Sequence, residues 1–198
     1  MAVQLGITMF KNPARQAATT QPAPERLAAF SDGVLAIIIT IMVLDLKAPH
    51  DASLRALLDL WPTFFSYALT YLFVGVFWVN HHHLLHHTER ADPMVIWANL
   101  LTLFFVSLIP FSTAYMAENR MDPFTTALYA GIFLLVTVAF MTDARLLAMD
   151  RAARKRNWIA LAAYAVAIPA GYLHPAVSLL INLGIAALYF VPDALKRT

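Results

Sequence analysis

Five of the seven histidines in this 198-residue chain lie within one short stretch, residues 81–87. The stretch ends in an HxxHH pattern, a spacing at which neutral imidazoles share a metal ion in membrane di-iron centres. Such a centre needs several boxes of this kind, and the two remaining histidines, His50 and His174, are isolated. The sequence therefore predicts no enzyme, no catalytic residue and no metal site. Adventitious metal binding and pH sensing by the cluster stay open.

A second set of polar residues interrupts segments that are otherwise apolar. Asp32 follows Ser31 roughly one and a half turns into the first apolar segment, where an unpaired carboxylate costs about 3 kcal/mol. Its partners are expected from the next two segments, because these carry histidine, indole and amide N–H groups at similar depth. The expected polar network comprises Arg26, Phe30, Ser31, Asp32, Trp78, Asn80, His81, His82 and Asn99. In the alternative interpretation, these side chains form no network and only extend into the lipid headgroup region.

Composition places both sets of residues in a membrane protein. Apolar residues make up 60% of the chain and charged residues 13%, with a mean hydropathy of +0.64, whereas soluble domains have roughly 45–50% apolar and about 25% charged residues. The absence of cysteine excludes disulfides and thiolate-bound metals. A formal charge of +2 is too small for a nucleic-acid-binding face. The sequence contains no P-loop, dinucleotide, GxSxG or TVGYG motif.

Six apolar segments are long enough to cross roughly 30 Å of hydrocarbon as helices. They predict an all-α integral membrane protein with helices over approximately residues 25–46, 54–86, 94–117, 123–149, 157–173 and 175–194. Residues 1–24 are expected to form a mobile cytoplasmic tail, and residues 25–198 a single six-helix domain. Only a few residues around His174 separate the last two helices, so one re-entrant hairpin is the alternative there.

The distribution of basic residues predicts the orientation of the chain. With six helices, both termini lie on the same side of the membrane as the second and fourth loops. That side holds eleven Lys and Arg residues, and the other side holds three. Because basic residues concentrate on the cytoplasmic side, both termini are expected in the cytoplasm. The run over residues 151–156 is part of this bias and is a weaker candidate for a lipid-headgroup site.

The first predicted helix presents two different faces. At about 100° per residue, Thr40, Ile41 and Leu44 fall within about 60° of Ile37, whereas Asp32 lies about 140° away. One face is therefore expected to bury the polar network in its own subunit, while the other presents an apolar stripe with one hydroxyl. Spacing alone leaves open whether the stripe meets lipid, the core of the subunit or a partner.

Residues 26–37, RLAAFSDGVLAI, resemble the RxxxFSD signature at the start of the first helix in the transmembrane protein 175 family of endolysosomal and bacterial potassium channels. The FWVNHH sequence of residues 77–82, the six expected helices and the chain length are also similar to the bacterial members. The resemblance covers about the first 120 residues. The last two helices match the family only in number and hydrophobicity.

The resemblance implies a potassium-selective cation leak channel in the bacterial inner membrane, a homotetramer in which the first helix of each subunit lines a central pore. It implies a hydrophobic gate with a nearby hydroxyl layer, which falls on Ile37, Thr40, Ile41 and Leu44 here, and a packing role for the RxxxFSD residues. Potassium is then the permeant ion, no cofactor is expected, and the partners are membrane lipid and the other subunits. A secondary transporter of cations or small solutes is the alternative function, and a non-catalytic scaffold or proton permeation also stays open.

Overall fold

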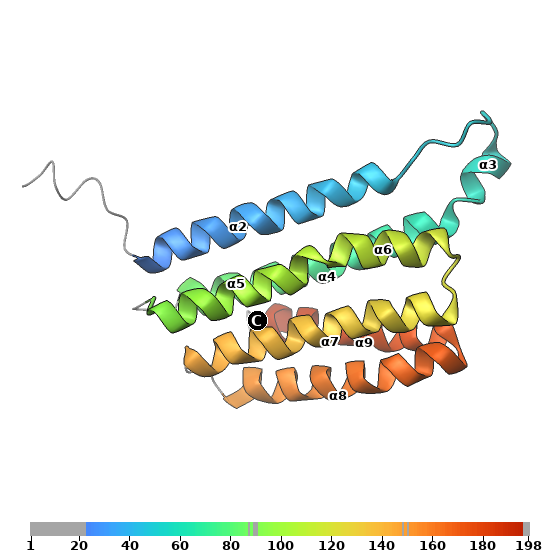
Figure 1. The fold of residues 1–198 in the computed structure, drawn as a ribbon. Coiled ribbons are helices and arrows are strands. Elements are labelled where there is room, and N and C mark those ends of the chain that lie inside the picture. The colour runs from blue at the N-terminus through green and yellow to red at the C-terminus, as the bar shows by residue number, and fades with distance from the viewer. Residues whose placement is uncertain (1–22, 87, 89–90, 148, 150, 196–198) are drawn as a thin grey trace, which may run out of the picture.

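The computed structural model describes residues 23–86, 88, 91–147, 149 and 151–195, and every regular element within these ranges is a helix (Figure 1). The predicted all-α class is confirmed. In chain order the elements are α2 (Ala23–Ile41), the 3-10 helix η1 (Met42–Asp45), α3 (Leu54–Leu58), α4 (Trp61–His86), α5 (Pro93–Ser107), α6 (Ile109–Glu118), α7 (Pro123–Leu146), α8 (Arg151–Leu173) and α9 (Pro175–Leu195). Nearly all of the tail expected over residues 1–24 lies outside the described residues.

The long helices lie side by side in one bundle, with α2 along one edge and α7 near the middle (Figure 1). α7 packs against α5, α6, α8 and α9, whereas α2 contacts mainly α4 and α5. This difference is reflected in burial, because 61% of the apolar span of α7 is buried but only 33% of that of α2. α2 is therefore left with a long face that no other described part of the chain covers.

Prolines account for two differences from the expected helix bounds. The helix expected over residues 54–86 is divided into α3 and α4 by a turn at Asp59 and Leu60, and Pro62 lies in the first turn of α4. The helix expected over residues 94–117 is interrupted at Leu108, two residues before Pro110. Proline has no N–H and its ring clashes with the preceding turn, so it starts a helix more readily than it continues one.

The fifth expected helix, over residues 157–173, also differs in its start. α8 begins at Arg151, so the helix includes a basic first turn that the search for apolar residues left out. The other expected bounds lie within a few residues of those in the structure, except that α2 continues beyond Ile41 as η1.

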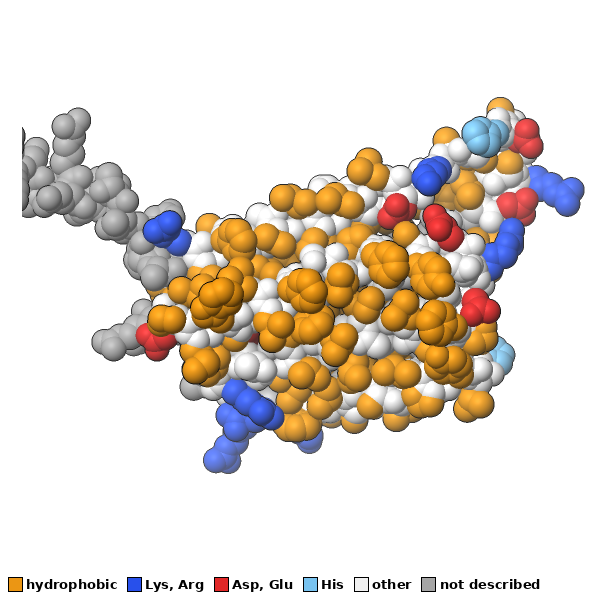
Figure 2. All heavy atoms as spheres, in the orientation of Figure 1, with side chains coloured by type: hydrophobic (Ala, Val, Ile, Leu, Met, Phe, Trp, Pro, Cys, Tyr) orange, Lys and Arg blue, Asp and Glu red, His pale blue; other side chains and the backbone are white. Residues whose placement is uncertain are grey.

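The surface of the bundle is that of a membrane protein. Four segments of the described chain are long and apolar enough to cross a membrane: Pro24–Asp45, Trp61–His86, Pro93–Glu118 and Pro123–Leu146. Figure 2 shows apolar side chains over the middle of the bundle and charged side chains at its two ends. Such a band flanked by charges matches a hydrocarbon layer between two aqueous boundaries.

α8 approaches the backbone of α7 closely at Gly171. A Cβ atom at this position would lie 3.1 Å from the backbone nitrogen of Ala127 and 3.2 Å from its Cα atom. In α9, a Cβ atom on Gly184 would meet nothing within 4 Å. A side chain at position 171 would therefore push α7 and α8 apart by a few tenths of an ångström, whereas position 184 has space for a side chain.

Candidate functional site

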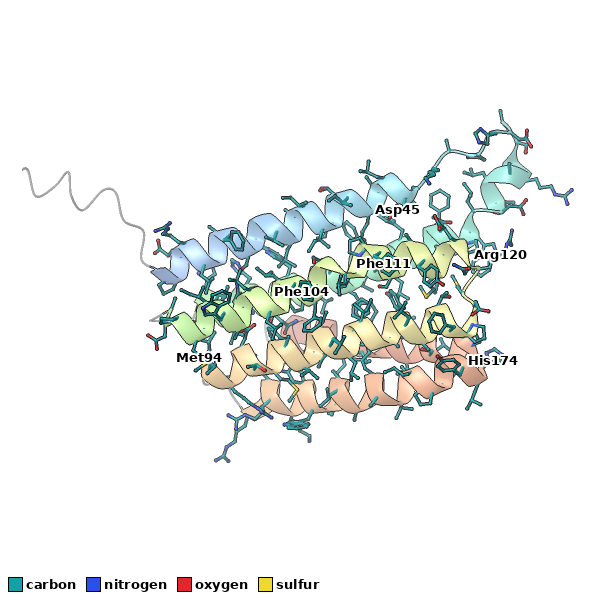
Figure 3. The ribbon with its side chains drawn as sticks, in the orientation of Figure 1. Asp45, Met94, Phe104, Phe111, Arg120 and His174 are labelled. Atoms are coloured by element: carbon teal, nitrogen blue, oxygen red, sulfur yellow. The ribbon has the colours of Figure 1, made fainter. Side chains whose placement is uncertain are left out.

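Between Gly33 and Leu44, the face of α2 and η1 that points away from the rest of the chain is apolar apart from one hydroxyl. Ile37 is 57% exposed, Ile41 46% and Leu44 72%, and Thr40 lies exposed among them. We call these four residues the α2 stripe. The Thr40 hydroxyl donates to the carbonyl oxygens of Ala36 and Ile37, each 3.0 Å away, which leaves its oxygen able to accept a further contact. In Figure 3, α2 runs along the edge of the bundle toward the labelled Asp45.

The opposite face of α2 is buried against α4 and α5. It comprises Leu27, Ala28, Ser31, Leu35, Ile38 and Met42. These positions recur every three or four residues, which is the spacing of one side of an α-helix. Burial on this side and exposure on the other fix which face of α2 is available to a partner.

Three buried polar side chains join α2, α4 and α5, and we call them the Asn99 triad. Asn99 Nδ2 donates to Ser31 Oγ at 3.0 Å, and Asn99 Oδ1 lies 2.8 Å from His81 Nε2. Because an amide oxygen only accepts, the His81 Nε2–H is the donor in the second contact. Ser31 in turn donates to the Leu27 carbonyl oxygen at 2.9 Å. The three side chains are at most 1% exposed, so these hydrogen bonds are shielded from solvent.

Asp32 lies beside this triad in a separate contact between α2 and α4. Trp78 Nε1 donates to Asp32 Oδ1 at 2.8 Å, and His82 Nδ1 is 3.8 Å from the other carboxylate oxygen. The Asp32 side chain is 38% exposed and that of His82 33%. The carboxylate is therefore held at the margin of the helix contact rather than in its buried centre.

Three residues of the expected network lie outside both contacts. Arg26 and Phe30 are exposed on the first turns of α2. Asn80 donates to the Val76 carbonyl oxygen of its own helix at 2.8 Å and lines a cavity on another side of α4. Asn80 follows Trp78 by two residues, or about 200° around the helix, so the spacing itself separates it from the face that meets Asp32.

The histidine cluster is only partly grouped in the structure. The rings of His82 and His86 have centroids 4.1 Å apart, one turn apart on α4. His87 lies outside the described residues. Over the described part of the chain, no three side chains of the His, Asp and Glu types come together as metal ligands.

Two buried polar contacts were missed by the sequence reasoning. Asp143 in α7 is 1% exposed; its Oδ2 accepts from Thr102 Oγ1 at 2.6 Å. An acid inside an apolar helix was the signal for this contact. The second contact is between hydroxyls: Thr70 Oγ1 lies 3.0 Å from both Thr113 Oγ1 and the Tyr129 hydroxyl. Threonine and tyrosine are frequent in apolar helices, so spacing gave no signal for this group.

Comparison with known proteins identifies the family. The model of the family described as endosomal/lysosomal potassium channel TMEM175 matches residues 26–110. A potassium channel of Chryseobacterium sp. (strain P1-3) is 30% identical over 178 residues, which cover 85% of this chain and 93% of that protein. The chain belongs to the TMEM175 family. The matched residues 26–110 include the α2 stripe, the Asn99 triad and the contact between Asp32 and Trp78.

Two further matches, one of sequence and one of structure, come from Chamaesiphon minutus. A potassium channel is 36% identical over 132 residues, covering 62% of this chain and 65% of that protein. The crystal structure of a lysosomal potassium-selective channel TMEM175 homolog matches with a TM-score of 0.76 and 30% identity, over 87% of this chain and 97% of that chain. This TMEM175 family member is thus a multi-pass membrane protein in a family of ion channels rather than of enzymes.

Proposed function

We propose that this protein conducts potassium passively through a pore formed by four copies of the chain, with α2 of each copy lining the pore. The observation that carries the proposal is the α2 stripe, a row of exposed aliphatic side chains with one hydroxyl on a helix whose other face is buried. Relatives named potassium channels support potassium as the permeant ion. The resemblance of residues 26–32 to the RxxxFSD signature implies the tetramer of that family, and this supports four copies.

Rings of aliphatic side chains explain how such a pore closes. Ile37 and Ile41 are four residues, or roughly 6 Å, apart along α2, and Leu44 follows on the same face. Four copies of each side chain form narrow apolar rings that exclude water and ions, because alkyl walls offer no replacement for the hydration shell. A small rotation or outward tilt of α2 widens these rings and opens the pathway.

Thr40 is the proposed basis of ion preference. Its hydroxyl is the one side-chain oxygen of the α2 stripe, and its hydrogen is already donated within the helix. Potassium gives up its hydration shell at lower cost than sodium. A short constriction with few oxygen ligands therefore favours potassium modestly, without the discrimination of a carbonyl-lined filter.

The polar contacts behind α2 have a structural role in this proposal. The Asn99 triad and the hydrogen bond from Trp78 to Asp32 both attach α2 to its neighbours within one subunit. Asp32 lies about 140° around the helix from Ile37. These residues therefore set the rotation and depth of α2 and do not coordinate the permeant ion.

The proposal includes six membrane spans with both termini in the cytoplasm of a bacterial cell. At about 1.5 Å per residue, the apolar part of α8, residues 157–173, extends roughly 26 Å and α9 roughly 32 Å, and both lengths fall within the roughly 17–25 residues of a membrane-spanning helix. The basic side chains of the described chain divide between Arg26, Arg145, Arg151, Arg154, Lys155 and Arg156 at one end and Lys47, Arg55 and Arg120 at the other. This excess supports a cytoplasmic location for the first end.

Potassium flux from liposomes tests the function and the position of the pore together. Purified protein in potassium-loaded vesicles should release potassium down its gradient without any counter-substrate. Leu44→Ala should raise this flux because it widens the most exposed apolar ring. Leu180→Ala is the matched control, since Leu180 is 67% exposed on α9 and lies outside the α2 stripe.

Each outcome of this assay separates the alternatives. Equal fluxes in the wild type and the Leu44→Ala variant would place the pore on another helix. Flux that requires a counter-substrate would indicate a secondary transporter. Flux of protons in place of potassium would show that the proton is the permeant ion. Vesicles that stay impermeable to ions would indicate a non-catalytic scaffold.

A further inference from the structure

An apolar groove lies between α4 and α9, with α7 as its floor. Its volume is about 60 Å³, several times the roughly 10–15 Å³ that one water molecule needs. Its walls include Val76, Phe77, Phe133, Phe140, Ala186 and Tyr189. The half-buried state of Val76 and Tyr189 shows that the groove opens on the side of the bundle.

Two polar side chains of this groove, Asn80 and Thr137, donate within their own helices. Asn80 Nδ2 donates to the Val76 carbonyl oxygen at 2.8 Å, and Thr137 Oγ1 donates to that of Phe133 at 2.9 Å. Water in the groove would find few of the two to four partners that hold it in a buried site. Aliphatic and aromatic walls at membrane depth instead suit a hydrocarbon chain.

A cation lies at one end of the groove, and no anionic partner for it is found among the described side chains. The guanidinium carbon of Arg156 is 5.8 Å from the centre of the Tyr189 ring, which lines the groove. The Tyr189 hydroxyl donates to Asn157 Oδ1 at 2.7 Å, which fixes the ring beneath the cation. Arg156 Nε is buried, and among the side chains that the structure describes, which leave out those of residues 190–195, it has no hydrogen-bond partner and no carboxylate. A desolvated N–H of this kind favours an anion that enters from outside the chain.

The surroundings of Arg156 indicate which anion that is. Arg151, Arg154 and Lys155 lie on the same first turns of α8, and basic side chains gather at this end of the bundle in Figure 2. Basic residues at such a boundary attract anionic lipid headgroups. A phosphodiester at the level of Arg156 would place its acyl chains beside the mouth of the apolar groove.

We infer that the groove between α4 and α9 binds one acyl chain of an anionic phospholipid whose phosphate pairs with Arg156. The lipid packs on Val76 and Phe77, which lie on a side of α4 different from Trp78, the residue that holds Asp32. The lipid therefore stabilises α4 on a side that does not face Asp32. The site lies outside the α2 stripe, so the inference does not depend on the proposed function.

Lipid binding to the purified, delipidated full-length protein in neutral detergent tests the inference. Dioleoyl phosphatidylglycerol should raise the midpoint of thermal unfolding and appear as bound lipid in native mass spectrometry, and dioleoyl phosphatidylcholine should do so much less. Arg156→Gln should weaken phosphatidylglycerol binding about fivefold or more, the contribution of one basic residue at a membrane surface. Arg151→Gln, which removes the same charge away from Tyr189, should keep most of the binding.

A second pair of variants tests the acyl chain separately. Val76→Phe fills the open side of the groove and should weaken binding of the whole lipid, whereas Val166→Phe adds the same ring at an exposed position of α8 outside the groove and should not. Inorganic phosphate alone should give no stabilisation. Equal losses in Arg156→Gln and Arg151→Gln, no loss in Val76→Phe, or equal effects of phosphate and phosphatidylglycerol would each overturn the inference.

Discussion

Removing the amide of Asn99 is the most informative perturbation of the contacts behind α2. Asn99→Leu keeps the volume of the side chain but leaves the His81 Nε2–H without its acceptor at 2.8 Å. Ser31 still donates to the Leu27 carbonyl oxygen at 2.9 Å, so one buried donor is stranded rather than two. A buried donor without an acceptor costs roughly 1–3 kcal/mol in general. Hydrogen bonds between helices inside membranes contribute about 0.6 kcal/mol to stability on average and about 1.7 kcal/mol at most. We expect a loss of about 1–2 kcal/mol.

The midpoint of thermal unfolding of the purified protein in detergent measures this loss. For a chain of this length, each kcal/mol lowers the midpoint by about 2–4 °C, so Asn99→Leu should unfold roughly 2–8 °C below the wild type. Asn80→Leu is the matched control. The Asn80 amide donates only to the Val76 carbonyl oxygen within α4, so its removal strands no partner and should change stability by no more than about 0.5 kcal/mol.

A double variant separates the stranded hydrogen bond from lost packing. Adding His81→Phe to Asn99→Leu removes the unpaired donor and places a phenyl ring next to Phe77 and Phe140, whose centroids lie 5.5 and 6.3 Å from the His81 ring. Replacing both partners by apolar groups can be nearly neutral, so the double variant should recover at least half of the loss. If Asn99→Leu and Asn80→Leu unfold alike, or the double variant is less stable than the single one, the triad does not hold α2 as argued.

Three other perturbations test separate parts of the molecule. Thr40→Ala should lower the potassium-over-sodium permeability ratio obtained from reversal potentials, while Thr142→Ala, at an exposed position of α7, should not. An unchanged ratio in both variants would show that the Thr40 hydroxyl does not contribute to ion preference. Asp32→Ala should destabilise the protein by about 0.5–1 kcal/mol and reduce the assembled fraction in gel filtration, because the hydrogen bond from the half-exposed Trp78 indole is lost. A fully assembled variant that now admits sodium would instead make Asp32 an ion ligand. Gly171→Ala should lower the free energy of unfolding by about 1–3 kcal/mol relative to Gly184→Ala, which gains the same helix propensity without the short contacts to α7. Equal unfolding midpoints would show that the two helices simply move apart.

The sequence determined those properties that depend on a single helix. Apolar runs of membrane length predicted an all-helical membrane protein, and the angular spacing of α2 separated Asp32 from the stripe that the structure leaves exposed. Both results follow from composition and from the fixed 100° rotation per residue. The same arithmetic would have separated Asn80 from Trp78, and the acid at position 143 was visible inside an apolar helix.

Only the tertiary structure decided which polar groups meet. Ser31 and Asn99 are 68 residues apart and bond at 3.0 Å, while Asp32, next to Ser31 in the chain, contacts Trp78 instead. Helical periodicity fixes the direction of a side chain around its own axis, but not the rotation and depth of the neighbouring helix that it faces. Those are set by how the apolar side chains of α4, α5 and α7 pack together, and the partner of each polar group follows from that packing.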